Sequence, residues 1–297
     1  MCNGFSFDHG PQSMTNSILT SKVFPLTPSP SWLKTLPSKD YWSTPFAKSL
    51  LSKLDLSQGI SILDVACGSG VPSFYLADRV GPTGRIVGID IHEAQLRQAR
   101  AYQGLSFPWL EFRQGDVRSL PTDLPQFDRI TGNLAFMFFR PHRKKALQQL
   151  VSFLKRGGQV VLTFPSRGTF DSLWKRVEKA MTEQGLMKER HAFRAYQDER
   201  PSASDASQWL HEIGLERVEV EEQPLDVPTG SGEAFLHHPL LRAGFLDDVF
   251  ECFADQSLAQ NFMNAIADDV ESFLPLTAQR CVMSGWRPLK SLPSAIA

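Results

Sequence analysis

The chain has 297 residues, a hydrophobic share of 42% and a formal net charge of -1. This length suits one α/β core of roughly 200 residues with an appendage or insertion. The nearly neutral charge argues against a nucleic-acid partner or an anionic membrane surface. Because no apolar run approaches the ~18 residues that cross a bilayer, we expect no membrane span.

The cysteines do not form a recognisable framework. Cys2, Cys67, Cys252 and Cys281 lie far apart, without a CxxC pair. A disulfide scaffold and a structural zinc site are therefore not expected, and no other metal is expected either. The first residues have neither the basic start nor the apolar stretch of a secretory signal. Together these observations predict a cytoplasmic protein.

The elements are predicted in chain order from hydrophobic periodicity. Residues 1–40 are rich in Ser, Thr and Pro and show no sustained period, which predicts a poorly ordered N-terminal leader. Apolar residues recur at helical spacing over 41–56, and from there apolar runs alternate with helical patterns. The predicted strands of this alternation are residues 60–66, 85–89, 110–113, 127–131 and 159–164. The predicted helices are residues 71–80, 92–102, 141–157 and 170–184.

A helix over 204–213 and strands at 215–220 and 281–286 complete the predicted core. Alternating strands and helices predict a parallel sheet covered on both faces, because each right-handed crossover needs a helix to return the chain. The predicted organisation is a core of residues 41–222 and 278–290, with a helical, Phe-rich insertion at 223–277 between the last two strands.

One turn carries the clearest functional signal. The first strand runs into Gly68 and Gly70, where missing Cβ atoms allow a ligand to approach the backbone and the next helix offers unpaired N–H groups. Asp90 ends the second strand, where its carboxylate can accept both hydroxyls of a ribose. This pattern predicts a nucleoside-bearing ligand, and its spacing alone suits NAD equally well.

Two further acids favour S-adenosylmethionine. Asp64 lies four residues before Gly68, where it would repel a pyrophosphate but attract an ammonium or sulfonium group. Asp116 follows the third strand, where the amino group of an adenine could donate to it. A dinucleotide fold does not need this second acid.

Residues 62–70, 81–90, 114–116 and 154–158 resemble the class I S-adenosylmethionine-dependent methyltransferases, especially the branch that includes the ubiquinone/menaquinone C-methyltransferases. The resemblance implies a Rossmann-like, seven-stranded sheet with helices on both faces. It implies that the methionine moiety is lined by Asp64, Ala66, Gly68 and Gly70, with Asn133 near its end. It also implies that Asp90 holds the ribose and that Ile91 lies against the adenine. The edge of the adenine would be bound by Asp116 and Val117. Ala66 departs from the pattern, because many relatives have glycine there.

Methyl transfer from a sulfonium requires little acid–base chemistry. The leaving group is a neutral thioether, so alignment of the reactants and exclusion of water are the main requirements. A general base is needed only for some acceptors. Candidate bases are His142, which follows the fourth strand, and His237 and His238 in the insertion. His142 is equally explained as a solvated residue in the first turn of a helix.

An apolar cluster follows the fourth strand. Phe136, Phe138 and Phe139 either pack as ordinary core or form, with the insertion, an apolar acceptor pocket. In this fold such insertions commonly lie over the acceptor, so a small, partly apolar acceptor is expected. Tyr41 closes over the cofactor or packs as an aromatic at a helix start. The basic residues of the run 140–145 either bind a phosphate group or lie on a solvated face of a helix.

Three functions are compatible with these residues. The first is methyl transfer to a metabolite or natural product, in a monomer or homodimer. The second is a methyltransferase-like protein that binds the cofactor in a structural or regulatory role, without turnover. The third is a nicotinamide-dependent oxidoreductase, which would bind NAD and ignore S-adenosylhomocysteine.

Overall fold

The computed structural model describes residues 41–103, 106–242 and 244–289, which belong to one compact unit. The leader predicted at residues 1–40 lies outside this described part.

A seven-stranded sheet forms the centre of the fold, in the order β3-β2-β1-β4-β5-β7-β6. Its strands are β1 (Ser61–Val65), β2 (Arg85–Asp90), β3 (Leu110–Gln114), β4 (Phe127–Gly132), β5 (Leu154–Pro165), β6 (Glu216–Val227) and β7 (Leu276–Trp286). The first five strands pair in parallel, as predicted. β7 runs antiparallel to both β5 and β6, so the sheet is mixed. The predicted Rossmann-like architecture is confirmed.

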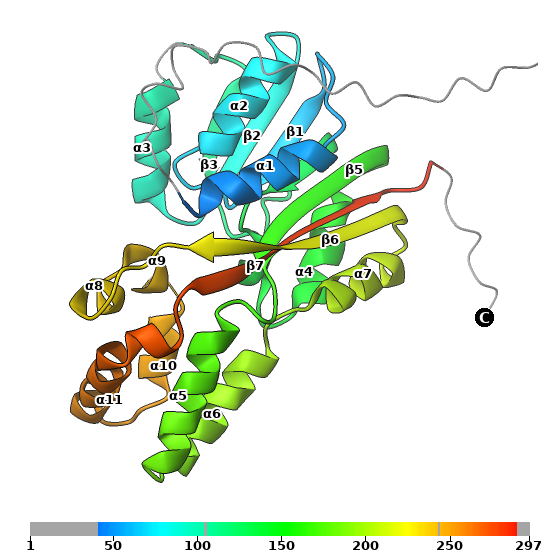
Figure 1. The fold of residues 1–297 in the computed structure, drawn as a ribbon. Coiled ribbons are helices and arrows are strands. Elements are labelled where there is room, and N and C mark those ends of the chain that lie inside the picture. Colours follow the sequence, from blue (N-terminus) through cyan, green and yellow to red (C-terminus); the bar gives the residue numbers. More distant parts are fainter. Residues whose placement is uncertain (1–40, 104–105, 243, 290–297) are drawn as a thin grey trace, which may run out of the picture. The chain divides into compact units, whose positions relative to one another are not determined.

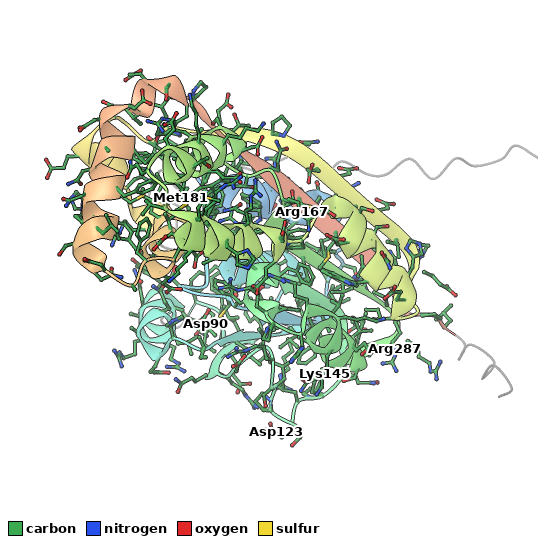
Figure 2. All side chains as sticks on the ribbon, turned by 90° about the horizontal axis from the view of Figure 1, so that it is seen from below. Asp90, Asp123, Lys145, Arg167, Met181 and Arg287 are labelled. Carbon is green, nitrogen blue, oxygen red and sulfur yellow. The ribbon has the colours of Figure 1, made fainter. Side chains whose placement is uncertain are left out.

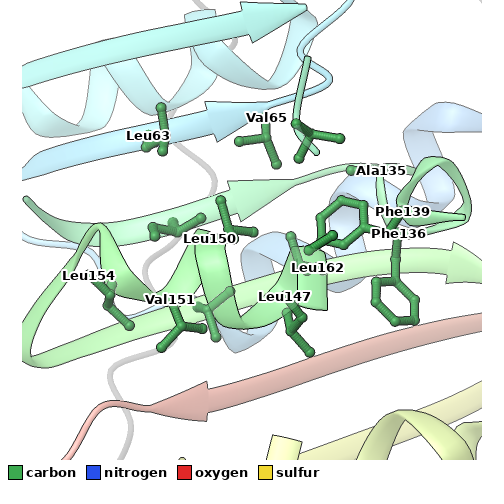
Figure 3. Packing of buried hydrophobic residues seen from close by; sticks show 14 of the residues in the cluster. Leu63, Val65, Ala135, Phe136, Phe139, Leu147, Leu150, Val151, Leu154 and Leu162 are labelled. Carbon is green, nitrogen blue, oxygen red and sulfur yellow. The ribbon is translucent and has the colours of Figure 1, made fainter. Parts of the chain in front are cut away.

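Helices cover both faces of this sheet (Figure 1). They are α1 (Ser43–Lys53), α2 (Val71–Val80), α3 (Glu93–Gln103), α4 (Arg143–Ser152) and α7 (Ala203–Glu212). Side chains alternate along β1, so Leu63 and Val65 pack in a first core with α4 and α7, which Figure 3 shows in part. Asp64 points to the opposite face and contacts α2.

The prediction that a helix ends at the glycine pair 157–158 is wrong. α4 ends at Ser152, and both glycines lie inside β5. A Cβ on Gly158 would come 2.8 Å from the carbonyl oxygen of Asp128 in the neighbouring strand. Glycine is therefore needed there for close strand pairing. The sequence does not distinguish such a glycine from one that ends a helix.

Six helices form a second hydrophobic core of their own. They are α5 (Asp171–Glu183), α6 (Met187–Asp198), α8 (Glu233–Leu236), α9 (Pro239–Arg242), α10 (Leu246–Glu251) and α11 (Gln256–Asp268). We call residues 170–198 and 233–273 the helical subdomain. The insertion predicted at 223–277 therefore differs from the helical subdomain in two ways. The ends of the predicted range belong to the strands β6 and β7, and the subdomain also contains α5 and α6, which precede that range in the chain.

The helical subdomain is attached at the edge of the sheet that is formed by the carboxyl ends of its parallel strands. α5 follows the carboxyl end of β5, and α8 follows the carboxyl end of β6, which runs parallel to β5. The carboxyl ends of β1, β2 and β4 lie at the same edge, where ligands bind in open α/β sheets. Among the described helices, none is both long and apolar enough to cross a membrane.

The sheet ends on one side at β6, which pairs only with β7. Its exposed side chains include five acids: Glu216, Glu219, Glu221, Glu222 and Asp226. Lys53 of α1 forms ion pairs with Glu219, at 3.0 Å, and with Glu221.

Candidate cofactor and acceptor site

The turn between β1 and α2 has three residues in the left-handed region: Ala66 (φ 52°), Gly68 (φ 55°) and Gly70 (φ 83°). A Cβ on Gly68 would meet no atom within 4 Å, so its backbone faces open space. A Cβ on Gly70 would come 2.7 Å from the ring of Phe112. Gly68 therefore suits the predicted approach of a ligand, whereas Gly70 makes room for the protein's own packing.

Asp90 connects this turn to the end of β2. Its carboxylate accepts hydrogen bonds from the backbone N–H of Gly68 and from that of His92, both at 2.8 Å. The side chain is 9% exposed. Each carboxylate oxygen has further lone pairs, so Asp90 can hold the turn and still accept ribose hydroxyls. It lies beside α3 (Figure 2).

Asp64 lies beneath the turn and has no exposed surface. Its two oxygens accept hydrogen bonds from Ser73 Oγ at 2.5 Å and Thr131 Oγ1 at 2.9 Å. Burial raises the pKa of this carboxyl to about 6, although both hydroxyls act in the opposite direction. The side chain ties β1 to α2 and β4, and its contact with the methionine moiety stays a prediction.

The residues predicted to bind the adenine follow β2 and β3. Ile91 is 48% exposed directly after Asp90, so its apolar side chain offers a surface to a base. Val117 is buried. Asp116 accepts hydrogen bonds from the backbone N–H of Arg118 at 2.8 Å and from its guanidinium at 2.6 Å. Arg118 lowers the pKa of Asp116, and an adenine amino group would share the carboxylate with it.

Asn133 joins β4 to the start of α1. Its amide nitrogen donates to the carbonyl oxygen of Ser43 at 3.0 Å, and its carbonyl accepts from Thr163 Oγ1 at 2.9 Å. These bonds bring residues 41–43 to the edge of the sheet near the turn. Tyr41 is 58% exposed, and its predicted contact with the cofactor stays a prediction.

The three phenylalanines after β4 form a short 3-10 helix, η2 (Phe136–Phe139), and have different surroundings. Phe136 and Phe139 are fully buried in the first core, with ring centroids 5.2 Å apart. Their prediction as pocket residues is therefore corrected to core packing. Phe138 is 56% exposed and is the member that can meet an acceptor.

The predicted bases are placed unequally. His142 is exposed at the N-cap of α4, and the side chain of His237 is 74% exposed, 4.0 Å from Glu233. His238 is partly buried, and its Nδ1 is buried with no hydrogen-bond partner among the described residues. No group of three or more His, Cys, Asp or Glu within the described ranges is arranged to hold a metal.

Sequence reasoning missed several residues near the site. Ser73 and Thr131, which bind Asp64, carry no sequence signal because hydroxyls are common in helices and strands. Tyr196 and Arg200 are four residues apart on and after α6, a spacing that places an aromatic ring beside a guanidinium. That spacing could have been found.

Comparison with known proteins agrees with this geometry. Residues 62–158 match the model of a family described as "Methyltransferase domain". The chain is 34% identical over 131 residues to a demethylmenaquinone methyltransferase of Lactococcus lactis, covering 44% of this chain and 50% of that protein. It is 34% identical over 124 residues to nocamycin O-methyltransferase of Saccharothrix syringae, covering 41% and 43%. The matched segments thus span about half the length of these relatives or less.

Similar structures support the fold. The YcgJ protein of Bacillus subtilis superimposes with a TM-score of 0.54 at 16% identity, covering 82% of this chain and 99% of that one. Residues 62–158 thus match a methyltransferase domain, and the fold agrees with the predicted class I, S-adenosylmethionine-dependent methyltransferase. Within this class, its sequence relatives include the quinone methyltransferases.

Proposed function

We propose that the whole protein transfers a methyl group from S-adenosylmethionine to a small, partly apolar metabolite or natural product. The observation that carries this proposal is Asp90, which holds the open Gly68 turn through one hydrogen bond and stands at the tip of β2. The names of the relatives, a demethylmenaquinone and a nocamycin methyltransferase, support a small-molecule acceptor.

The residues of the site fit this cofactor. The space in front of Gly68 is open, Asp90 keeps acceptor capacity for a ribose, and the exposed Ile91 offers an apolar surface to the adenine. When bound, S-adenosylmethionine supplies a methyl group on a sulfonium whose leaving group is neutral. The chain's own residues then need to orient the acceptor and exclude water, and proximity supplies much of the rate.

The acceptor is proposed to bind between Phe138 and the helical subdomain. Helix α5 follows β5 after the short segment 166–170. Residues 41–43 connect Asn133 to the subdomain through Trp42, whose ring lies 6.1 Å from that of Phe170 and 5.8 Å from that of Phe245. The two alternative functions can be distinguished by ligand binding and turnover: a non-catalytic protein would bind the cofactor without turnover, and a dinucleotide enzyme would bind NAD.

The test begins with calorimetry. S-adenosylhomocysteine and S-adenosylmethionine should bind to the wild-type protein, and NAD should not. Asp90→Ala should weaken binding by about 100-fold, because it removes hydroxyl contacts and releases the Gly68 turn. Asp78→Ala, an exposed change on α2, is the matched control. NAD binding, or equal binding by Asp90→Ala, would refute the assignment.

Turnover separates the enzyme from the non-catalytic binder. Formation of S-adenosylhomocysteine is followed with a panel of quinone, phenol and macrolide acceptors. Tight cofactor binding without turnover on any acceptor would favour the regulatory alternative.

A further inference from the structure

Arg200 lies in an aromatic enclosure of the helical subdomain. The residue is 9% exposed. Its guanidinium carbon lies 5.2 Å from the ring centroid of Trp174, 4.9 Å from that of Tyr196 and 4.9 Å from that of Phe245. One nitrogen, Nη2, donates to the hydroxyl of Tyr196 at 2.6 Å. Three rings therefore cover the faces of a cation whose edge carries the remaining N–H donors.

This cation has no direct counter-ion in the described part of the chain. No carboxylate there lies within 4.0 Å of its nitrogens. Asp248 on α10 interacts with the same Tyr196 hydroxyl and attracts the guanidinium electrostatically, but it lies beyond ion-pair distance of Arg200. Burying an arginine without a paired anion is costly. A bound anion would remove that cost.

The enclosure adjoins the proposed acceptor site. The ring of Phe245, which contacts Arg200, also lies 5.8 Å from that of Trp42, and Trp42 precedes the Ser43 carbonyl held by Asn133. Contacts thus run without a break from the carboxyl end of β4 to Arg200.

The neighbouring charges add to the positive character. Arg167 (labelled in Figure 2) donates from Nε to the carbonyl oxygen of Arg200 at 3.1 Å. Arg140 is paired with Glu199 at 3.7 Å, and Arg167 with Asp205 at 3.5 Å. Arg143, next to these groups, has a buried Nε without a partner among the described residues.

We propose that Arg200 determines acceptor specificity by binding an anionic group, a carboxylate or a phosphate, of the molecule to be methylated. The inference rests on the proposed function and narrows it: the acceptor has an apolar body and one anionic end. A guanidinium whose faces are covered by rings suits this role, because its N–H groups can form two parallel charge-assisted hydrogen bonds to an oxyanion.

The test uses probes that share one body. Protein saturated with S-adenosylhomocysteine is titrated by calorimetry with 4-phenylbutanoate, 4-phenylbutanamide and 3-phenylpropyl phosphate. At least one anion should bind about tenfold or more tightly than the amide, and the tighter of the two identifies the group. If both anions bind no better than the amide, the proposal is overturned, and this comparison needs no variant.

Variants assign the effect to Arg200. Arg200→Gln should bring the anion and the amide within about threefold of each other, and Arg200→Lys should keep part of the preference. The matched control is Arg242→Gln: Arg242 also stacks on a ring, that of Phe250 at 4.7 Å, but is paired with Asp247 at 3.1 Å. Its variant should keep the wild-type preference.

The two proposals fail separately. If the wild-type protein does not bind S-adenosylhomocysteine, the proposed function is refuted. If the wild-type protein binds S-adenosylhomocysteine but a folded Arg200→Gln protein keeps the preference for the anions over the amide, only the proposed role of Arg200 is refuted. A purely structural Arg200 would lower the unfolding temperature of that variant and leave the preference intact.

Discussion

The carboxyl group of Asp64 combines complete burial with two hydroxyl partners and no positive charge among its hydrogen bonds. Burial disfavours its ionised form, and the nearby charge of Asp90 adds to this effect, so its pKa rises to about 6 from an ordinary 3.8. Well below pH 3.8 the side chain is neutral in both folded and unfolded chains. As the pH rises toward 6, the unfolded chain releases this proton first, and folding loses stability.

We therefore predict that Asp64→Asn changes the pH dependence of stability. Relative to the parent, the variant should gain up to about 3 kcal/mol of unfolding free energy between pH 4 and pH 7, because a shift of about 2 pKa units is removed. Urea unfolding of both proteins across this range measures it. Asp78→Asn, on the exposed face of α2, is the control. Parallel curves for parent and Asp64→Asn would contradict the prediction.

The short helix η2 shows how one element serves two environments. Phe139 is fully buried beside Phe136, whereas Phe138 is 56% exposed one position earlier. Phe139→Ala should lower the unfolding free energy by about 3–5 kcal/mol, because it leaves a cavity in the first core. Phe138→Ala should change stability by less than about 0.5 kcal/mol and raise the KM for the acceptor. Denaturant titration and kinetics test both, and equal destabilisation by the two would be inconsistent with these placements.

At the level of elements, periodicity and turn residues were sufficient for most of the fold. The alternation from β1 to β5 was predictable because each strand is a short apolar run bounded by turns. The second core was not, because α6 is mostly polar and buries only Phe193, so its apolar period is weak. The sequence predicted that Asp90 ends the strand next to the Gly68 turn, and the structure adds a hydrogen bond between these two residues. The surroundings of Asp64 depend on Ser73 and Thr131, which only the folded chain brings together.

For the whole molecule, the arrangement of the two cores determines how it unfolds. β7 contributes Ala278 to the core of the helical subdomain and Cys281 to the first core, three residues further along the same strand. Neither core can open fully without breaking the pairing of β7. The helical subdomain is therefore expected to behave as part of one cooperative unit.

Hydrogen exchange can test this coupling. In increasing urea, peptides from α4 and α11 should lose protection at the same midpoint, because each helix is held by a core that shares β7. A slow-exchanging α4 beside an α11 that opens at clearly lower urea would show that the subdomain unfolds alone.

The acidic outer strand has a consequence for crowded solutions. The free edge of an edge strand can pair with that of another copy, and two β6 edges meeting in this way would bring their carboxylates together, which repel each other. Glu219 and Glu221 are partly neutralised by Lys53, but Glu216 and Asp226 keep the ends of the row negative. High salt or mild acid weakens this repulsion, so protein stored under those conditions is the more exposed to sheet-to-sheet aggregation.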